Sequence, residues 1–207
     1  MSIKFYYAPR SNASRIRWTL EELGVPYEQV RIDLRAGDQR KPEFLALNPN
    51  GKVPTLVLDD TPLFESVAIQ IALGERFGVD KGLWPAPGSP EHHQALSWIV
   101  WGQVTFGAAL FRRLMNTSDW LSKESHNALQ AEDALKEMNH CLAILNARLD
   151  DRHYLTGPRF TLVDLDLASV LAWGLQATGV DRSQYPNVKA WHDRCVQRPA
   201  MKVLAEE

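Results

Sequence analysis

Cysteine is scarce in this sequence: its 207 residues include only Cys141 and Cys195. Two cysteines are too few for the disulfide framework of a small secreted protein, and they suit a reducing compartment. The first residues, M-S-I-K-F-Y-Y, also lack the basic-then-apolar layout of a secretory signal. We therefore expect a cytoplasmic globular protein whose two cysteines fill buried apolar positions.

Long apolar runs and a basic excess are also absent. No apolar run approaches the roughly 20 residues that span a bilayer, so we expect no membrane segment. The net charge of -2 argues against a nucleic-acid binder, which would carry a basic excess. His92 and His93 are neighbours in a helical stretch and point about 100° apart, so no metal site is expected. With 45% hydrophobic residues, the chain can bury a sizeable core.

Proline is absent from residue 91 to residue 157, and this gap separates two kinds of sequence. The part before it alternates strand-like and helix-like pieces in the order βαβαββα. Strands are expected at 3–7, 27–33, 55–58 and 62–64, and helices at 14–24, 41–47 and 67–77. Later helices are expected at 91–116, 123–149, 161–177 and 187–197, with a short tail from 199. We therefore predict an α/β domain over residues 1–79, a Pro/Gly-rich linker over 80–90 and an all-α helical bundle over 91–207.

Two of the later helices carry start signals. In F-T-L-V-D, Thr161 is expected at the N-cap with Asp164 three residues later, which is a variant of the capping box. In Y-P-N-V-K-A-W, Asn187 is expected to be the N-cap. These signals support helices over 161–177 and 187–197.

The stretch from Asn48 to Leu58, N-P-N-G-K-V-P-T-L-V-L, combines a turn signal with a buried strand. Its second proline, Pro54, stands where the strand begins, and a proline there removes a hydrogen-bond donor from the sheet. One interpretation is a rigid start to an edge strand. The other is a cis Val53–Pro54 bond, which turns the chain and leaves the backbone of Val53 free to bind a ligand.

Five motifs follow one another along the chain: Y-Y-A-P-R-S-N-A-S-R, N-P-N-G-K-V-P-T-L, F-E-S-V-A-I, L-T-G-P-R-F-T-L-V-D and Y-P-N-V-K-A-W. In this order they resemble the cytosolic glutathione transferase family, in particular its bacterial serine-type or nu-like members. The resemblance implies a thioredoxin-like domain joined to a helical domain, a cis Val53–Pro54 bond and a homodimer. It also implies glutathione as co-substrate, a small apolar electrophile as second substrate, and a role in detoxification.

The first predicted domain has no cysteine, so sulfur chemistry there needs a thiol that arrives with a ligand. A free thiol has a pKa of about 8.5, and only the thiolate is a good nucleophile. Lowering that pKa by about two units requires roughly 2.7 kcal/mol of preferential anion stabilisation. A hydrogen bond to a charged group supplies about 1.5–3 kcal/mol, and a helix N-terminus adds about 0.3–1 kcal/mol. One hydroxyl at the start of the first helix therefore suffices.

Three residues are candidates for binding the sulfur, in the order Ser11, Asn12 and Tyr6. Serine-type members of the family use a serine in the pattern S-x-x-x-R, which Ser11 and Arg15 match. Asn12 matches the asparagine that members similar to disulfide-bond reductases present to the thiol. Tyr6 matches the tyrosine of the tyrosine-type classes. The structural alternatives are a helix cap for Ser11 or Asn12 and a sheet residue for Tyr6.

The resemblance also implies residues for the rest of the glutathione molecule. The backbone of Val53, next to Pro54, would pair with the cysteinyl backbone of glutathione. Ser66 would bind the γ-glutamyl carboxylate at the start of the third helix, and Glu65 would help to bind the ammonium group. The alternative for this pair is a simple helix cap.

Basic residues accumulate at the N-terminus, where the first twenty residues include Arg10, Arg15 and Arg17 and no acid. This charge is either a solvated face or a source of positive potential that favours a thiolate beside the first helix. Arg10 is expected to face the site. Lys52 is expected to bind a ligand carboxylate, with simple exposure as the alternative.

Other functions and surfaces remain open. Asn12 and its loop also suit a glutathione-dependent disulfide or peroxide reductase, and transferase-like domains also serve as non-catalytic ligand-binding proteins. Trp98 is expected in the core, whereas Phe106, Leu110 and Phe111 could lie in the core or line an apolar pocket. The predicted third helix is apolar on more than one face, which favours a two-fold dimer.

Overall fold

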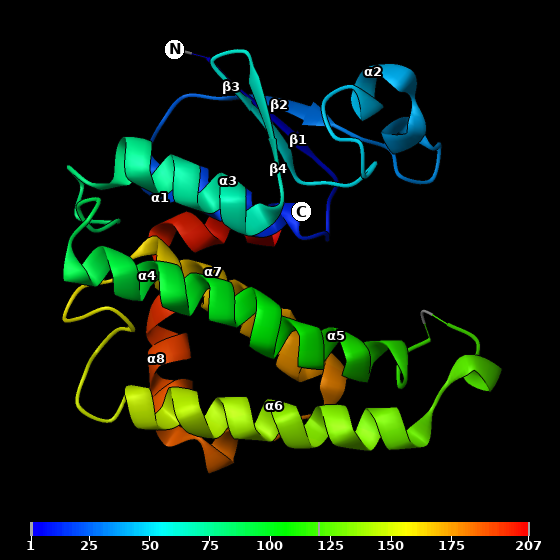
Figure 1. Cartoon of the computed structure of the whole chain (residues 1–207), viewed down its shortest axis with the longest axis vertical. Coiled ribbons are helices and arrows are strands. Elements are labelled where there is room, and N and C mark those ends of the chain that lie inside the picture. The colour runs from blue at the N-terminus through cyan, green and yellow to red at the C-terminus, as the bar shows by residue number, and fades with distance from the viewer. Residues whose placement is uncertain (1, 120, 207) are drawn as a thin grey trace. The chain divides into compact units, whose positions relative to one another are not determined.

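The computed structural model describes residues 2–119 and 121–206, which form two compact units. One unit contains the chain up to Pro87 together with the chain from Arg198 onward, and the other is Gly88–Gln197 (Figure 1). The sequence-based division placed the tail with the helical domain over 91–207. The tail groups with the first unit instead, because it packs along the first helix of that unit.

The first unit contains a sheet of four strands: β1 (Ile3–Tyr7), β2 (Glu28–Arg31), β3 (Thr55–Leu58) and β4 (Thr61–Phe64). Their order is β2-β1-β3-β4, with β1 parallel to β2 and the other two pairs antiparallel (Figure 1). The parallel pair is joined through helix α1 (Ala13–Leu23), because parallel strands need a crossover connection. This mixed sheet confirms the predicted thioredoxin-like domain.

Helices α1 and α3 (Ser66–Leu73) pack on each other and on the sheet, whereas α2 (Pro42–Leu45) is a short turn. The 3.6-residue period of α1 places Ile16, Leu20 and Leu23 on one buried face. The fully buried large side chains of this unit include Phe5, Ile16, Trp18, Leu20, Leu23, Leu56, Ile69 and Leu73. Helix α1 ends as predicted at Gly24, whose φ of 58° is the left-handed conformation that favours glycine.

Helix α3 ends earlier than the predicted 67–77, because its last turn widens into a π-turn at Gly74–Gly78. The indole of Trp84 packs on this turn and is only 2% exposed. A Cβ atom at Gly74 would lie 2.7 Å from the Cδ2 atom of the Trp84 ring. The approach of the ring therefore requires glycine at this position.

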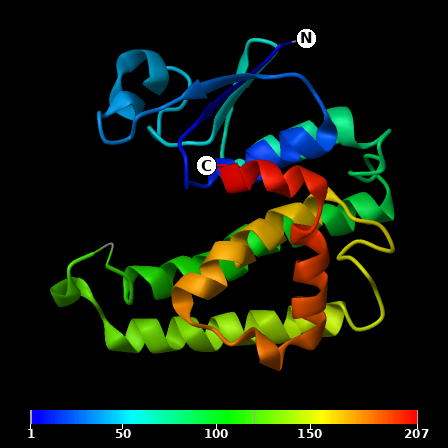
Figure 2. The same cartoon turned by 180° about the vertical axis from the view of Figure 1, so that it is seen from behind.

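The C-terminal segment, a 3-10 helix over Pro199–Glu206, lies beside α1 (Figure 2). Just before it, the Arg198 guanidinium donates two hydrogen bonds of 2.7 Å to the two carboxylate oxygens of Glu22. Trp18 also donates its indole N–H to Glu22, over 3.1 Å. The Glu22 side chain is only 6% exposed, so this bidentate pair ties the tail to α1 in a nearly dry environment.

Arg198→Ala is expected to lower the free energy of unfolding by about 3 kcal/mol, because it leaves the Glu22 carboxylate buried without its cation. Urea titration of the variant measures this change. The matched control is Arg152→Ala, which removes an ion pair with Asp151 whose side chain is 73% exposed, and which should cost less than about 1 kcal/mol. Equal losses in the two variants would contradict the prediction.

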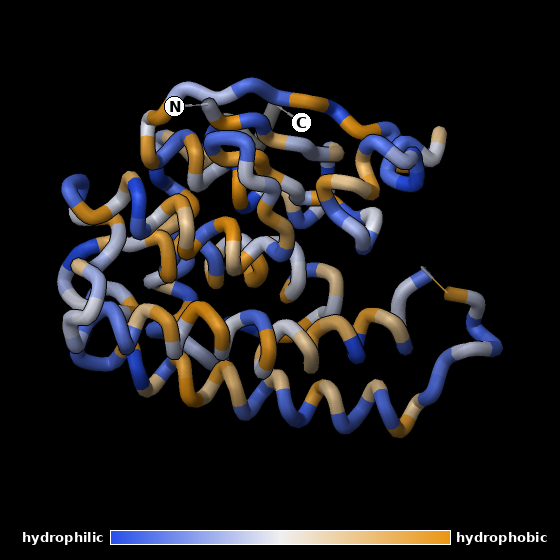
Figure 3. The backbone as a smooth tube through the Cα atoms, turned by 45° about the horizontal axis from the view of Figure 1, so that its top comes forward, coloured by the Kyte–Doolittle hydropathy of each residue, from blue (hydrophilic) through white to orange (hydrophobic). Residues whose placement is uncertain are grey.

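The second unit contains α4 (Pro90–Trp101), α5 (Gly107–Met115), α6 (Ala128–Arg148), α7 (Leu162–Thr178) and α8 (Pro186–Val196). Helix α7 contacts α4, α5 and α8 and is buried on every side from Leu162 to Ala168, as expected for the central helix of a bundle. Along α6, hydrophobic and hydrophilic residues alternate (Figure 3), and one face is buried. Within the described residues, no helix is both long and apolar enough to cross a membrane.

The single helix predicted over 91–116 is interrupted by a π-turn at Gly102–Phe106. There the N–H of Gly107 donates to the carbonyl of Gly102, five residues back, so the turn holds one extra residue. Close packing also favours glycine where α5 and α7 meet, since a Cβ atom at Gly174 would lie 2.5 Å from the Cδ2 atom of Leu110 and that side chain would have to shift.

The predicted start of α7 is confirmed, with Thr161 at the N-cap and Asp164 completing a capping box. Asp164 is fully buried and accepts four hydrogen bonds. Its donors are the backbone N–H of Leu155, the indole N–H of Trp191, and the N–H and hydroxyl of Thr161, at 2.8–3.0 Å. Burial raises the pKa of the Asp164 carboxyl, and the four donors oppose that rise.

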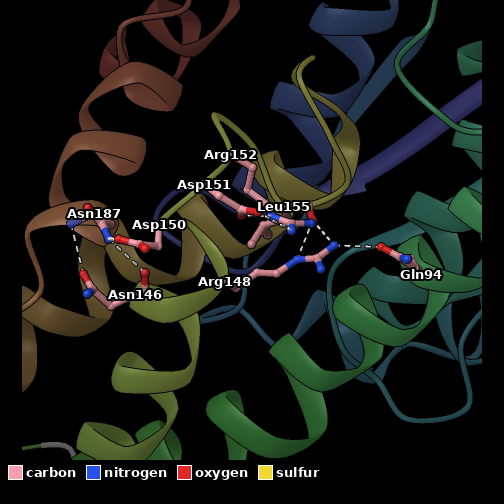
Figure 4. Close-up of polar contacts among 8 residues, drawn as sticks. All are labelled: Gln94, Asn146, Arg148, Asp150, Asp151, Arg152, Leu155 and Asn187. Atoms are coloured by element: carbon pink, nitrogen blue, oxygen red, sulfur yellow. Dashed lines mark hydrogen bonds and ion pairs between the residues drawn. The ribbon is translucent and has the colours of Figure 1, made fainter.

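The predicted N-cap at Asn187 is wrong. Helix α8 starts one residue earlier, at Pro186, and its first free N–H groups are capped from α6. Asn146 accepts the N–H of Asn187 at 3.0 Å through Oδ1, and Asn187 donates its side-chain amide to the Asn146 carbonyl and to Asp150 (Figure 4). A proline at the first helical position explains the shift, because proline lacks an N–H that would need a cap.

A second polar junction joins α4, α6 and the segment between α6 and α7 (Figure 4). The Arg148 guanidinium donates twice to the carbonyl of Leu155, at 2.7 and 3.0 Å, and once to the side chain of Gln94, at 2.7 Å. Its guanidinium carbon also lies over the Trp98 ring, 5.4 Å from the ring centroid. Arg148 therefore holds three segments together through hydrogen bonds and a cation–π contact.

Candidate functional site

Three strands end or begin at the same end of the sheet. Tyr6, near the end of β1, pairs with Thr55 at the start of β3, and Thr55 pairs with Phe64 at the end of β4. Antiparallel pairing therefore places three segments side by side. They are the loop between β1 and α1, the Lys52–Pro54 segment before β3, and the start of α3 after β4. These are the segments in which the sequence places its site residues.

Ser11 lies in the loop between β1 and α1, and its hydroxyl is engaged within that loop. The Oγ atom donates to the carbonyl of Ala8 over 2.7 Å and accepts the N–H of Ala13 over 3.2 Å. The Ser11 carbonyl also accepts the N–H of Ser14 at 3.1 Å. The Ser11 side chain therefore acts as a helix cap, the structural alternative to binding sulfur, because it accepts an N–H of the first turn of α1.

Asn12 is exposed, and its amide is oriented by Arg15. The Arg15 guanidinium donates to Oδ1 of Asn12 over 3.1 Å. A guanidinium has only donors, so the amide oxygen must face Arg15 and the amide nitrogen must point away. Within residues 2–119 and 121–206, that nitrogen has no hydrogen-bond partner. Asn12 therefore offers an unused donor at the start of α1.

Tyr6 lies on the other face of the sheet from the core residue Phe5, as alternation along β1 requires. Its ring packs edge-on against Phe44 of α2, with 5.9 Å between the ring centroids. Arg10, by contrast, lies in the loop itself, is exposed, and has a φ of 54°, which is unusual for a residue other than glycine.

The segment before β3 contains the predicted cis Val53–Pro54 bond, which is confirmed. Val53 lies outside the sheet ladder, and neither of its backbone polar groups is hydrogen-bonded to another described residue. The Lys52 side chain is exposed. This segment therefore presents a free N–H and a free carbonyl at the end of the sheet, next to a cation.

Asn48, which the sequence analysis treated only as part of a turn, holds this segment from behind. It is 2% exposed and donates its amide to the carbonyl of Lys52 at 2.8 Å and to the hydroxyl of Thr55 at 3.0 Å. Its oxygen accepts the N–H of Asn50 at 3.0 Å. The signal that could have identified it is an asparagine between the apolar run 44–47 and a turn, because an amide that becomes buried there needs several partners.

Helix α3 begins at Ser66, and Glu65 stands before it with φ 68° and ψ 120°. Such a conformation costs a residue with a side chain about 1–3 kcal/mol, and it recurs at ligand-binding sites. Glu65 is exposed and Ser66 is partly exposed, and the Glu65 side chain does not cap the helix. The start of α3 therefore offers backbone N–H groups, a hydroxyl and a carboxylate to a ligand with both charges.

The aromatic candidates divide between core and surface. Phe106 and Leu110 are at most 2% exposed and belong to the core of the second unit. Phe111 is 55% exposed, and Trp98, expected in the core, is only half-buried. Among the described residues, no three His, Cys, Asp or Glu side chains are placed to bind a metal ion.

Comparisons with known proteins agree on one family. Residues 1–71 match the profile described as the glutathione S-transferase N-terminal domain, and residues 105–199 match its C-terminal domain. The disulfide-bond oxidoreductase YfcG of Escherichia coli K12 is 32% identical, over 96% of this chain and 92% of that protein. Glutathione S-transferase 2 of Schizosaccharomyces pombe is 27% identical, over 98% and 94%. A glutathione transferase homologue from Sulfitobacter, solved with bound glutathione, is 26% identical with a TM-score of 0.80, over 99% and 97%.

Proposed function

Because this chain belongs to the glutathione S-transferase family, we propose that glutathione binds where the β1–α1 loop, the Lys52–Pro54 segment and the start of α3 meet. The protein is a glutathione transferase, and glutathione is its co-substrate. The observation that carries the proposed location is the sheet register, which sets these three segments at one end of the sheet.

Each part of glutathione has a chemical counterpart there. The N–H and carbonyl of Val53 suit the cysteinyl backbone, as in the addition of a short strand, with Pro54 keeping the segment out of the ladder. Ser66 and the first N–H groups of α3 suit the γ-glutamyl carboxylate, and Glu65 suits the ammonium group. Lys52 suits the glycyl carboxylate, and Arg10 adds positive potential near the sulfur.

For the sulfur itself, hydrogen bonding favours Asn12 over Ser11. A Ser11 hydroxyl that donates to Ala8 would have to give up that bond in order to donate to a thiolate. The Asn12 amide nitrogen already points away from Arg15, because the Arg15 guanidinium binds the amide oxygen. We therefore place Asn12 first, Ser11 second and Tyr6 third, since the Tyr6 ring lies against α2.

The reaction follows from a stabilised thiolate. The thiol proton leaves to solvent, the sulfur lone pair forms a bond to an electrophilic carbon, and the leaving group departs with its bonding electrons. We propose small apolar electrophiles as second substrates and detoxification as the role. We also propose a cytoplasmic location, which suits two buried cysteines that form no disulfide, Cys141 and Cys195.

A glutathione-dependent disulfide or peroxide reductase is the second candidate. The specific observation in its favour is the unused Asn12 donor, together with the relative named as a disulfide-bond oxidoreductase. In the disulfide reaction the glutathione thiolate attacks one sulfur and displaces the other as a thiolate, which takes up a proton. A second glutathione thiolate then attacks the resulting mixed disulfide, and glutathione disulfide and the second substrate thiol are released. Turnover of a halonitroarene without reduction of a small disulfide supports the transferase assignment, and the reverse supports the reductase.

Glutathione binding is expected to stabilise the fold. At a concentration of 100 times Kd, the free energy of unfolding should rise by about 2.7 kcal/mol through mass action. Thermal melts with and without millimolar glutathione measure this, and Ser66→Ala should weaken the shift because it removes a ligand for the carboxylate. A melting temperature unmoved by both glutathione and its disulfide would rule out the proposed site.

We also propose a homodimer. Val100, Val104 and Phe111 expose apolar side chains along α4 and α5, at 44%, 65% and 55%, and a two-fold interface would cover such a surface on both copies. Light scattering at micromolar concentration should give twice the chain mass of 23.4 kDa. Val104→Glu should produce monomers, whereas Leu129→Glu, at an equally exposed position of 65% on α6, should not. A wild-type monomer would contradict the proposal.

A further inference from the structure

One buried cation stands next to the proposed sulfur ligand. Arg15 is only 4% exposed although it carries a full positive charge, and burial of an arginine is costly unless its charge is used. It lies three residues after Asn12, which puts the two side chains on the same side of the first turn of α1.

We propose that Arg15 is a positioning residue: it fixes the Asn12 amide so that Nδ2 points at the sulfur of glutathione. This rests on the proposed function, in which Asn12 binds the sulfur. Without Arg15, an exposed asparagine rotates freely and its oxygen can face the site as readily as its nitrogen. An oxygen facing a thiolate would repel it. The hydrogen bond of 3.1 Å from Arg15 to Oδ1 removes that orientation before the ligand arrives.

The same contact strengthens the donor. A cation bound to the amide oxygen draws electron density from the amide, so the N–H on the other side becomes a better hydrogen-bond donor. The neighbouring hydroxyl cannot replace it while it remains bound to Ala8 and Ala13. Arg15 itself is held from the next turn, where the Thr19 hydroxyl donates to the Arg15 carbonyl at 2.9 Å.

The test is the pKa of the glutathione thiol in the complex, followed by thiolate absorbance near 240 nm against pH. Arg15→Met should raise that pKa by about one unit and slow conjugation at neutral pH roughly tenfold, with the KM for glutathione almost unchanged. Arg15→Lys keeps a cationic donor and should recover part of the loss. Arg17→Met, which removes the same charge two residues further along α1 and on another side of the helix, should leave the thiol pKa unmoved.

A double-mutant cycle separates positioning from a purely structural role. If Arg15 acts through Asn12, Arg15→Met should add nothing to the pKa shift of Asn12→Ala. The proposal for Arg15 alone would be overturned if Arg15→Met shifted the thiol pKa equally in the wild type and in Asn12→Ala. It would also be overturned if Arg15→Met lowered the melting temperature and the glutathione affinity but left the thiol pKa unmoved. If Asn12→Ala itself leaves the thiol pKa unmoved, the assignment of the sulfur to Asn12 fails, and the role of Arg15 fails with it. Should Arg15→Met not fold, Arg15→Leu supplies the same comparison, because it also removes the donor that holds the Asn12 oxygen.

Discussion

Asn12→Ala is expected to raise the pKa of the thiol of bound glutathione by about one to two units, which corresponds to roughly 1.4–2.7 kcal/mol. The reason is the loss of a side-chain donor at the start of α1 that has no hydrogen-bond partner among the described residues. Conjugation of a halonitroarene at neutral pH should fall about 10–100-fold, in proportion to the thiolate fraction. Glutathione affinity should be nearly kept, because Val53 and the Glu65–Ser66 pair remain.

Three further variants complete the measurement. Ser11→Ala should change the thiol pKa less than Asn12→Ala, and Tyr6→Phe should leave it in place. Ser66→Ala should weaken glutathione binding and leave the thiol pKa almost alone, which shows that the two effects separate. If Ser11→Ala gives the largest shift, the order derived from the sequence is right and the hydroxyl exchanges its bond to Ala8 for one to the sulfur. If Tyr6→Phe gives the largest shift in the thiol pKa, the sulfur lies on the face of the sheet opposite the core residue Phe5.

Asp164→Ala is expected to have the largest effect on stability, a loss of at least about 4 kcal/mol. The substitution leaves the N–H groups of Leu155, Thr161 and Trp191 buried without an acceptor, and each such donor costs about 1–3 kcal/mol. It also breaks the capping box at the start of α7, the central helix of the second unit. Equilibrium unfolding in urea measures the loss.

The matched control for this prediction is Asp181→Ala. Asp181 also caps a helical turn, accepting the N–H and hydroxyl of Ser183 at 2.8 and 2.7 Å, but it is exposed. Its loss should cost about 1 kcal/mol, as for an ordinary cap. If Asp164→Ala and the wild type unfold at similar urea concentrations, the prediction is wrong, and the hydrogen bonds of the carboxylate stabilise the fold by no more than the free energy that its burial costs.

The strands could be predicted from sequence because their signals are local. The T-L-V-L strand lies between Pro54 and Asp59, and the structure has it at the predicted residues Thr55–Leu58. The π-turn at Gly102–Phe106 could not be predicted, since one extra residue in a continuous helical pattern leaves the apolar period almost unchanged. Asn187 was mistaken for the N-cap of α8, because the side chain that accepts the first free N–H of this helix belongs to Asn146, 41 residues earlier in the chain.

The site shows the same division between local and distant information. Motif spacing brought Ser11, Asn12 and Tyr6 forward together, because all three precede the start of α1 at Ala13 by seven residues or fewer. Spacing carries no information on which donors are already used, and the hydrogen bonds of Ser11 to Ala8 and of Arg15 to Asn12 decide that. The buried amide of Asn48 was missed for a related reason, since burial becomes visible only when the sheet is assembled.

The contact between the C-terminal segment and α1 determines which of the two units is completed first during synthesis. A ribosome adds about 5–20 residues per second, and 176 positions separate Glu22 from Arg198. Roughly 10–35 s therefore pass between the synthesis of the carboxylate and that of its cation. During that interval all the helices of the second unit emerge, so the unit that is translated first is the one that is completed last.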